Sequence, residues 1–419
     1  MLRDRFTGLW LHPDFRKLWA GHTIAQVGQQ ITVLAVPLTA ILLLDANAIQ
    51  MGILAASLNL PALVVGLFVG AWVDRLQRRP LLIAADIGRA ILLMSIPAAA
   101  LLDLLTIEHL YVTAFLVGFL TLVFDVAYRS YLPSLVSRER LIEGNSKLEL
   151  SRSAAEIGGP GLAGALIQVA TAPFAILVHA VSLLFSALFL GAIDASEAAA
   201  PARDPERRLW RDIADGLRLV FGHPMLRAIA GCAGTIGFFN AILETVLILY
   251  IVQELGLSPG VIGLIFAAGN VGFLLGALIP GRLTGWIGLG PALGLGLLVV
   301  GVGDLLVPLA AGPNVVVLIM LAIAQFLFGA GYLVFNINQV SLRQALTPDH
   351  LQGRMNATMS FMLYGVVPAG AILGGVLGTT VGLRPTLFLA ALGEILAILW
   401  LILSPVWSLR EHPQTADAG

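Results

Sequence analysis

Apolar residues fill this chain in long runs, and polar residues gather in the short stretches between them. A helix that spans the hydrocarbon core of a membrane needs roughly 20 mostly apolar residues. Twelve segments meet this requirement, at residues 19–44, 49–73, 81–103, 109–132, 147–170, 173–193, 227–253, 259–281, 287–310, 314–337, 356–380 and 384–404. The pattern predicts an all-α polytopic membrane protein with twelve transmembrane helices.

The longest interruption divides these segments into two groups of six. It opens with Ala, Pro and Asp residues, which are typical of a flexible linker, and continues with Leu209, Ile213, Leu217 and Val220 at helical spacing. This spacing predicts an amphipathic helix in the membrane interface, and a solvated linker is the alternative. We therefore expect an N-terminal bundle, a linker, a C-terminal bundle and a tail, at residues 1–193, 194–226, 227–408 and 409–419.

A weak internal repeat, offset by about 210 residues, indicates two related halves. Gly66–Gly70 corresponds to Gly276–Pro280, and Leu135–Leu141 corresponds to Ala345–Leu351. The two groups of helices are thus expected to form pseudo-symmetric six-helix bundles.

The composition is that of a protein embedded in a lipid bilayer. Mean hydropathy is +0.91 and only 12% of residues are charged, against about 25% in soluble proteins. The net charge of −1 gives no reason to expect a nucleic-acid partner. The single cysteine excludes an intramolecular disulfide and a Cys-cluster metal site. We find no metal-ligand spacing, phosphate loop or nucleophile motif, so we expect neither a cofactor nor an enzyme.

Positive charge is partitioned between the two ends of the expected helices. All of the 24 Lys and Arg residues except Arg384 fall at one side if the N-terminus is cytoplasmic, whereas the outer loops carry Asp45, Asp103, Glu108 and Glu254. By the positive-inside rule, both termini are expected to be cytoplasmic. The protein is thus predicted to be a multi-pass protein of the cell membrane.

A charged turn follows the second segment. It contains Gly70, Asp74, Arg75, Arg78 and Arg79. The sequence resembles the loop between helices 2 and 3 of the major facilitator superfamily, although Gln77 replaces the expected second Gly. The resemblance covers nearly the whole chain, since the twelve segments, the long middle loop and the repeat share the layout of that superfamily. It implies transport by alternating access, normally by a monomer.

Further stretches resemble one branch of this superfamily, the exporters of macrolide-type drugs and enterobactin-type siderophores. They are Phe15–Trp19, Phe124–Arg129 and Asp215–Arg218. Many relatives carry a Gly-Asp pair in the first helix, whereas this chain has Gly28-Gln29, which places any proton role there in doubt.

The superfamily resemblance also implies a gating network on the inner side. In that network the loop acid, here Asp74, and nearby arginines latch the outward-open state. Our candidates are Gly70, Asp74, Arg75, Arg78, Arg79, Asp125 and Arg129. Local charge neutralisation near the lipid headgroups is the alternative, because Asp86/Arg89, Asp125/Arg129 and Arg152/Glu156 are spaced to pair along one helix face.

A Gly-Pro motif in the fifth segment favours export over import. Gly159, Pro160 and Gly164 resemble the antiporter signature of the superfamily, with Ala163 in place of one glycine. Proline removes a backbone donor, and glycine allows bending and close helix approach.

Glu244 is the principal candidate for proton coupling. It lies near the middle of the seventh segment, four residues after Asn240 and far from any basic residue of that segment. Low dielectric disfavours the charged form of an unpaired carboxylate, so this group is suited to take up and release a proton. A permanently protonated Glu244 bound to Asn240 is the alternative. Asp125 and Glu156 are further candidates. Asp304 and Glu394 are weaker candidates, which are expected instead to support the fold or to snorkel.

Uncharged polar residues outline a possible substrate cavity. The superfamily resemblance implies that segments 1, 4, 7 and 10 line the pathway, and our candidates are Gln26, Gln30, Asn240, Glu244 and Tyr364. Ordinary hydrogen bonding between helices is the alternative for each of them.

We therefore expect a transporter that exports amphiphilic small molecules such as drugs or siderophores in exchange for protons. Its partners would be the lipid bilayer, the substrate and protons, with the proton gradient as energy source. A lysophospholipid flippase and a nutrient symporter on the same fold remain the alternatives.

Overall fold

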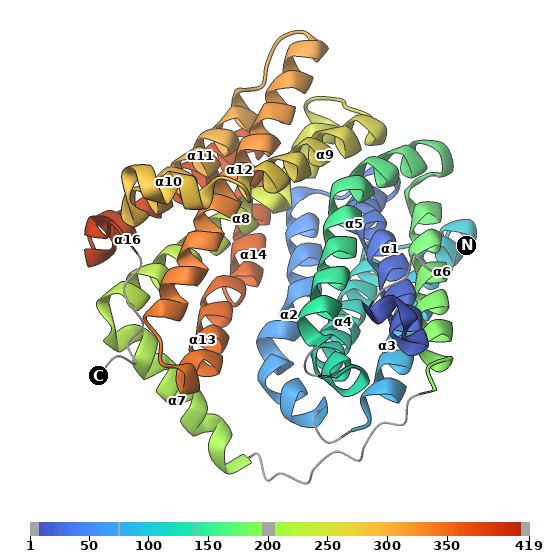
Figure 1. The fold of residues 1–419 in the computed structure, drawn as a ribbon. Coiled ribbons are helices and arrows are strands. Elements are labelled where there is room, and N and C mark those ends of the chain that lie inside the picture. The colour runs from blue at the N-terminus through green and yellow to red at the C-terminus, as the bar shows by residue number, and fades with distance from the viewer. Residues whose placement is uncertain (1–7, 74–75, 138–139, 195–205, 412–419) are drawn as a thin grey trace, which may run out of the picture. The chain divides into compact units, whose positions relative to one another are not determined.

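The structure is a computed structural model that describes residues 8–73, 76–137, 140–194 and 206–411. The described residues form helices and short turns, with no strand among them (Figure 1). This confirms the predicted all-α class. The chain divides into two compact units, each of which is described by itself.

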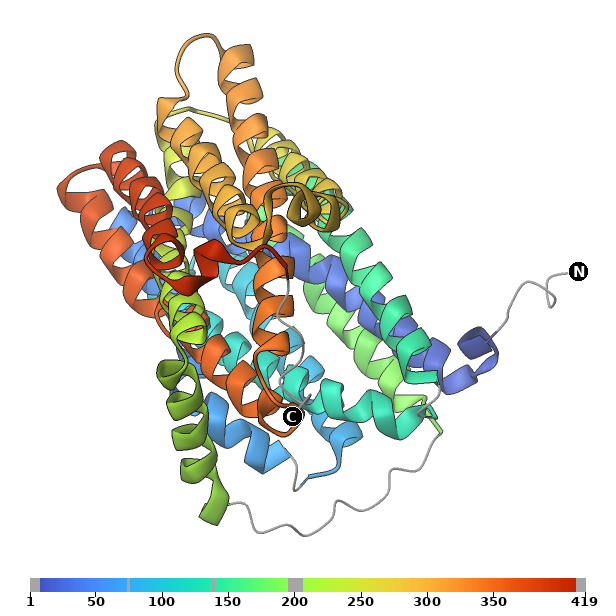
Figure 2. The ribbon, with the colours of Figure 1, turned by 60° about the vertical axis from the view of Figure 1, so that its left-hand side comes forward.

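Unit 1 comprises Met1–Ala46, Ser57–Arg203 and Ser258–Gly263. Its helices begin with η2 (Gly8–Leu11) and continue with α1 (Pro13–Leu44), α2 (Ala48–Val73), α3 (Arg78–Leu101), α4 (Ile107–Leu135), α5 (Leu141–Ala170) and α6 (Ala172–Gly191). The first part of α2, up to Ala56, belongs to the other unit. Helix α1 packs against α5 and α6, and α3 packs against α4 and α6. Figures 1 and 2 both show α1, α5 and α6 side by side.

A glycine sets the distance between α1 and α6. A Cβ atom at Gly28 would lie 2.2 Å from Ser182 Oγ and 2.8 Å from His179 Cδ2, so only glycine fits there. The close approach lets Thr32 of α1 reach across to α6, where its Oγ1 lies 2.7 Å from His179 Nδ1. A polar contact is thus held within the apolar interior of unit 1.

Unit 2 comprises Asn47–Ala56, Asp204–Leu257 and Leu264–Gly419. Its elements are α7 (Glu206–Gly222), α8 (Pro224–Gln253), α9 (Pro259–Gly276), α10 (Pro280–Ile287), α11 (Leu289–Leu309), α12 (Asn314–Ala345), η4 (Asp349–Leu351), α13 (Gln352–Tyr364), α14 (Val367–Thr380), α15 (Leu383–Leu396), α16 (Ile398–Ile402) and η5 (Pro405–Ser408). The first turn of α9, up to Gly263, belongs to unit 1. Helix α8 packs against α13, α14 and α15, and α11 packs against α12 and α15.

The helix α7 falls within the residues where the sequence predicts an amphipathic helix. Its Asp215 Oδ2 accepts a hydrogen bond from Arg354 Nη1 of α13 at 3.1 Å. A Cβ atom at the next residue, Gly216, would lie 2.8 Å from the Arg354 carbonyl oxygen. The described part of α7 therefore rests on α13, and its place in a membrane interface stays a prediction.

Eleven helical segments of the described residues are long and apolar enough to cross a membrane. The exception among the predicted spans is α5, whose first half carries Glu143, Lys147, Glu149, Arg152 and Glu156. The polytopic character is confirmed, whereas a twelfth span and cytoplasmic termini stay predictions.

Three predicted segments differ from the structure because each contains a break. The helix expected at 259–281 ends at Gly276, and α10 restarts at Pro280. The segment at 356–380 divides after Tyr364, and the last segment divides at Ala397. Proline lies in the first turn of both α10 and α14, where its missing N–H has no helical partner to lose.

Candidate functional site

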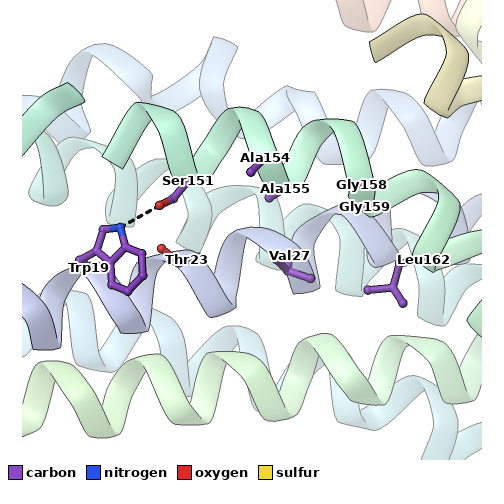
Figure 3. Close-up of a pocket in the computed structure, with 9 residues that line it drawn as sticks. All are labelled: Trp19, Thr23, Val27, Ser151, Ala154, Ala155, Gly158, Gly159 and Leu162. Carbon is purple, nitrogen blue, oxygen red and sulfur yellow. Dashed lines mark hydrogen bonds between the residues drawn. The ribbon is translucent and has the colours of Figure 1, made fainter. Parts of the chain in front are cut away.

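An apolar groove of about 420 Å³ lies between α1 and α5 in unit 1. Figure 3 shows its lining residues, which are Trp19, Thr23 and Val27 of α1 and Ser151, Ala154, Ala155, Gly158, Gly159 and Leu162 of α5. The small residues of α5 leave the space open. At one end the Trp19 indole Nε1 donates a hydrogen bond of 2.7 Å to Ser151 Oγ. The groove has the size and apolar character of a site for a small molecule.

The predicted antiporter motif forms two close helix contacts. A Cβ atom at Gly159 would lie 2.4 Å from Gln30 Cβ, so this glycine brings α5 against α1 beside a residue predicted to contact substrate. A Cβ atom at Gly164 would lie 2.6 Å from the Pro259 carbonyl oxygen and 2.9 Å from Gly263 Cα. The motif therefore lets backbone approach backbone, as expected for small residues in membrane helices.

A stacked set of side chains continues from Gln26, another residue predicted to contact substrate. The Gln26 amide Nε2 lies 3.2 Å from His22 Nε2. The His22 ring stacks on Tyr128 of α4 at 4.4 Å between centroids, and Tyr128 stacks on Phe124 at 5.7 Å. His22 is not among the residues predicted from the sequence. The available signal was its position, four residues before Gln26 on one helix face.

Asp86 and Arg89 form a buried ion pair at the end of this set. Their exposed fractions are 0% and 5%. The guanidinium also lies over the Phe124 ring, 4.4 Å from its centroid. The predicted gating residues Asp125 and Arg129 are exposed, and Asp125 is attracted electrostatically by both Arg89 and Arg129. Their role in gating stays a prediction.

The charged turn after α2 is described only in part. Asp74 and Arg75 lie outside the described residues, and Gly70 lies in the helical part of α2. Arg78 begins α3. Arg79 donates hydrogen bonds from Nε to the Leu190 carbonyl oxygen at 2.9 Å and from Nη2 to that of Gly191 at 2.5 Å. Arg79 therefore caps the carboxyl end of α6, where the helix dipole favours a cation.

Glu156, a predicted coupling residue, is paired. Arg152 donates a hydrogen bond of 2.5 Å to Glu156 Oε1 and another of 2.5 Å to Glu149 Oε1. The proposed spacing of Arg152 and Glu156 along α5 is thus confirmed as an ion pair. Because its charge is balanced, Glu156 is a weaker candidate for proton exchange than an unpaired acid.

Three carboxyl groups of unit 2 lie within electrostatic range of one another. Glu244 of α8 is influenced by Asp304 of α11, and Glu394 of α15 is influenced by both. Glu244 is the exposed residue in an otherwise buried stretch, 241–251. Asp304 and Glu394 are each only 2% exposed. These two were expected to support the fold or to snorkel, and snorkelling is wrong because their carboxyl groups lie inside the helix bundle.

The remaining predicted contact residues fall in both units. Gln26 and Gln30 are half-buried in unit 1. Asn240 is half-buried in unit 2, where its side chain approaches Glu394, and Tyr364 is 59% exposed at the end of α13. Within the described ranges, no group of three or more His, Cys, Asp or Glu side chains could hold a metal ion.

Comparisons with known proteins agree over nearly the full length. Residues 10–417 match the model of a family described as transmembrane secretion effector. The multidrug efflux pump Tap of Mycolicibacterium fortuitum is 28% identical over 378 residues, which cover 89% of this chain and 91% of Tap. The enterobactin exporter EntS of Salmonella typhi is 26% identical over 414 residues, or 97% of this chain and 96% of EntS.

A solved structure shares the fold. The crystal structure of a bacterial homologue of the iron transporter ferroportin in the inward-facing state matches with a TM-score of 0.75 and 20% identity. The match covers 94% of this chain and 98% of that one. At this identity the likeness concerns the fold alone.

Proposed function

Because the chain belongs to the transmembrane secretion effector family of the major facilitator superfamily, we propose that it exports amphiphilic small molecules in exchange for protons, by alternating access. It is a transporter and not an enzyme, and it resides in the plasma membrane as a multi-pass protein. Its partners are the lipid bilayer and a small-molecule substrate. Export is favoured by the drug and siderophore transporters among its relatives.

One observation carries the proton coupling: Glu244 is a carboxyl group within an apolar helix, and the charged group that acts on it is another acid. Electrostatic influence on it comes from Asp304. Ionisable residues inside membrane spans mark ion and proton pathways, because burying a charge without a partner is costly. Proton uptake by Glu244 neutralises it, and release restores its charge. This is the change that a proton-coupled cycle requires.

The apolar groove between α1 and α5 supports a substrate with a substantial apolar part. Its walls are aromatic, aliphatic and glycine residues, with hydroxyl groups at Thr23 and Ser151. The same groove would accept an acyl chain. A lipid flippase is therefore the second candidate function. A transport assay distinguishes it from the proton-coupled exporter.

The test is transport in proteoliposomes under an imposed pH gradient. We expect proton flux triggered by amphiphilic drugs or siderophores, and its loss in Glu244→Gln. The matched control is Glu254→Gln, an exposed carboxylate at the carboxyl end of the same helix, which should keep the flux. Lysolipid crossing without a gradient, with no substrate-triggered flux, would contradict the antiporter and favour the flippase.

A further inference from the structure

The helices α8, α11 and α15 are brought together by two glycines next to the buried acids. A Cβ atom at Gly393 would lie 2.2 Å from Phe239 Cδ1, which presses α15 onto α8. A Cβ atom at Gly301 would lie 2.2 Å from Ile395 Cγ1, which presses α11 onto α15. Glu394 lies between these two contacts in sequence, and Asp304 is three residues after Gly301. Both side chains are buried beside these contacts, with an exposure of 2% for each.

Among the described residues, the groups that act electrostatically on this pair include no cation. Helices α14 and α16 carry no ionisable side chain, and Asp304 is the ionisable residue of α11. Among the ionisable residues of α8, which are Arg227, Cys232, Glu244 and Tyr250, Glu244 acts on the pair. Tyr332 and Arg343 of α12 do not act on Asp304.

Arg384 belongs to the same helix as Glu394 but lies ten residues earlier. Ten residues of helix span about 15 Å. Its guanidinium Nε donates a hydrogen bond of 2.6 Å to the Pro308 carbonyl oxygen. Arg384 therefore neutralises neither Glu394 nor Asp304. In the described part of the chain, the two buried carboxyl groups have each other as their main charged neighbours.

Three of the four carboxyl oxygens of Asp304 and Glu394 accept no well-formed hydrogen bond. Both carboxyl oxygens of Glu394 and Oδ2 of Asp304 are buried in this way, although the Asn240 amide and the Asp304 carboxyl group interact with Glu394. An ionised carboxylate is an acceptor only, whereas a protonated carboxyl group supplies one O–H donor. Two facing carboxylates therefore lack the hydrogen that would join them, and one proton supplies it.

We propose that Asp304 and Glu394 share one proton and form a second protonation site in unit 2, beside Asn240 and Glu244. The proton moves from one carboxyl oxygen to the other by breaking one O–H bond and forming another. The pair keeps a single negative charge throughout. A pair of like carboxyl groups held close in an apolar interior favours this singly protonated state over two negative charges.

The role of this pair in transport rests on the proton coupling proposed above. The presence of the shared proton does not depend on that coupling. Glu244 takes up and releases the proton of that coupling, and the pair holds its own proton, with the Asn240 amide beside Glu394. Unit 2 then holds two carboxyl sites that act on each other. Protonation at one weakens the repulsion felt by the other.

The proton is tested by infrared spectroscopy of the purified full chain in lipid at neutral pH. A protonated carboxyl group has a C=O stretching band that ionised carboxylates lack and that shifts in D2O. We expect this band in Glu244→Gln and its loss in Glu244→Gln/Asp304→Asn/Glu394→Gln. Glu244→Gln/Glu108→Gln, which changes an exposed acid at the start of α4, should keep it. Absence of the band in Glu244→Gln would overturn the proposal, whatever the triple variant does.

Labelling assigns the band if the triple variant does not fold. A hydrophobic carbodiimide reacts with protonated carboxyl groups, and mass spectrometry locates the product. Modification of Asp304 or Glu394 supports the shared proton, whereas modification restricted to other carboxyl groups contradicts it. The transport assay separates the two proposals. Proton flux with no band rejects the pair and keeps the antiporter, and a band with no flux keeps the pair and rejects the antiporter.

Discussion

Trp19 of α1 and Ser151 of α5 are joined by a hydrogen bond of 2.7 Å that closes one end of the apolar groove (Figure 3). The rest of the groove is kept open by small residues, among which Gly158 has no atom within 4 Å of a Cβ built on it. A larger side chain at Gly158 can therefore enter the groove without disturbing the backbone.

Gly158→Leu is expected to fill the groove and to lower export of bulky substrates by about tenfold, the lower end of what one misfit in an apolar pocket costs. The measurement is substrate export from proteoliposomes at equal protein content. Gly161→Leu is the control, since Gly161 also has open space around its Cβ but does not line the groove. Equal export by both variants would show that the groove takes no part in transport.

The contact of Gly164 with Pro259 and Gly263 predicts a sharp limit on side-chain size. In Gly164→Ala the added methyl group would lie 2.6 Å from the Pro259 carbonyl oxygen. We expect a loss of about 1–3 kcal/mol of stability from overpacking, measured by denaturant unfolding in detergent. Gly161→Ala in the same helix should unfold like the parent, and a similar loss in both variants would trace the effect to helix propensity instead.

The buried ion pair of Asp86 and Arg89 should contribute more to stability than the exposed pairs of α5. Asp86→Asn leaves the Arg89 charge buried without its partner, for which we expect a loss of about 3 kcal/mol. The comparison is Glu149→Gln, which removes an exposed partner of Arg152 and should cost about 0–1 kcal/mol. Denaturant unfolding of both variants provides the measurement. A smaller loss for Asp86→Asn than for Glu149→Gln would refute the argument.

Acid should release the short helix η2 from α5. The pKa of the Glu143 carboxyl is held below its ordinary value of 4.5, first by the hydrogen bond of 2.9 Å that it accepts from the Leu9 backbone N–H and then by Lys147. A group whose pKa is lowered in the folded state stabilises the docked helix when the pH is above the ordinary pKa of that group. This stabilisation is lost as the pH falls through the lowered pKa. The contact should therefore persist at neutral pH and weaken below pH 4.5.

Trp10 reports on this release, because its ring lies 4.8 Å from the Trp19 ring and beneath Lys147. We expect its fluorescence, taken as the difference from Trp10→Phe, to change on acidification. In Glu143→Gln the acid-dependent change should be absent. If the fluorescence of that variant still changed on acidification, the change would have to come from a titrating group other than Glu143.

The overall architecture was accessible from the sequence because the signal is local. Apolar runs of about 20 residues identify membrane helices by length and composition alone. The breaks before Pro280 and Pro368 also carried a local signal. The break at Ala397 carried none, since a run of aliphatic residues continues on both sides.

The buried acids were underestimated because their surroundings are set by packing. Asp304 and Glu394 are ninety positions apart in the sequence, and they interact across helices that pack closely at Gly301 and Gly393. Similarly, nothing local places Tyr128 beside His22. Glu244 was identified because an acid within an apolar run stands out in the sequence. Its interactions with Asp304 and Glu394 depend on helix packing and leave no such local signal.

The charged first half of α5 has a consequence for how the protein is made. Each charge at the centre of a membrane helix costs about 2.5–3.5 kcal/mol during insertion, and α5 is the long helix of unit 1 that is not apolar enough to be recognised as a span by itself. In the folded unit it packs against α1 and α6, the second of which emerges from the ribosome after it. We therefore expect the predicted span at α5 to insert together with these neighbours and not as an independent segment.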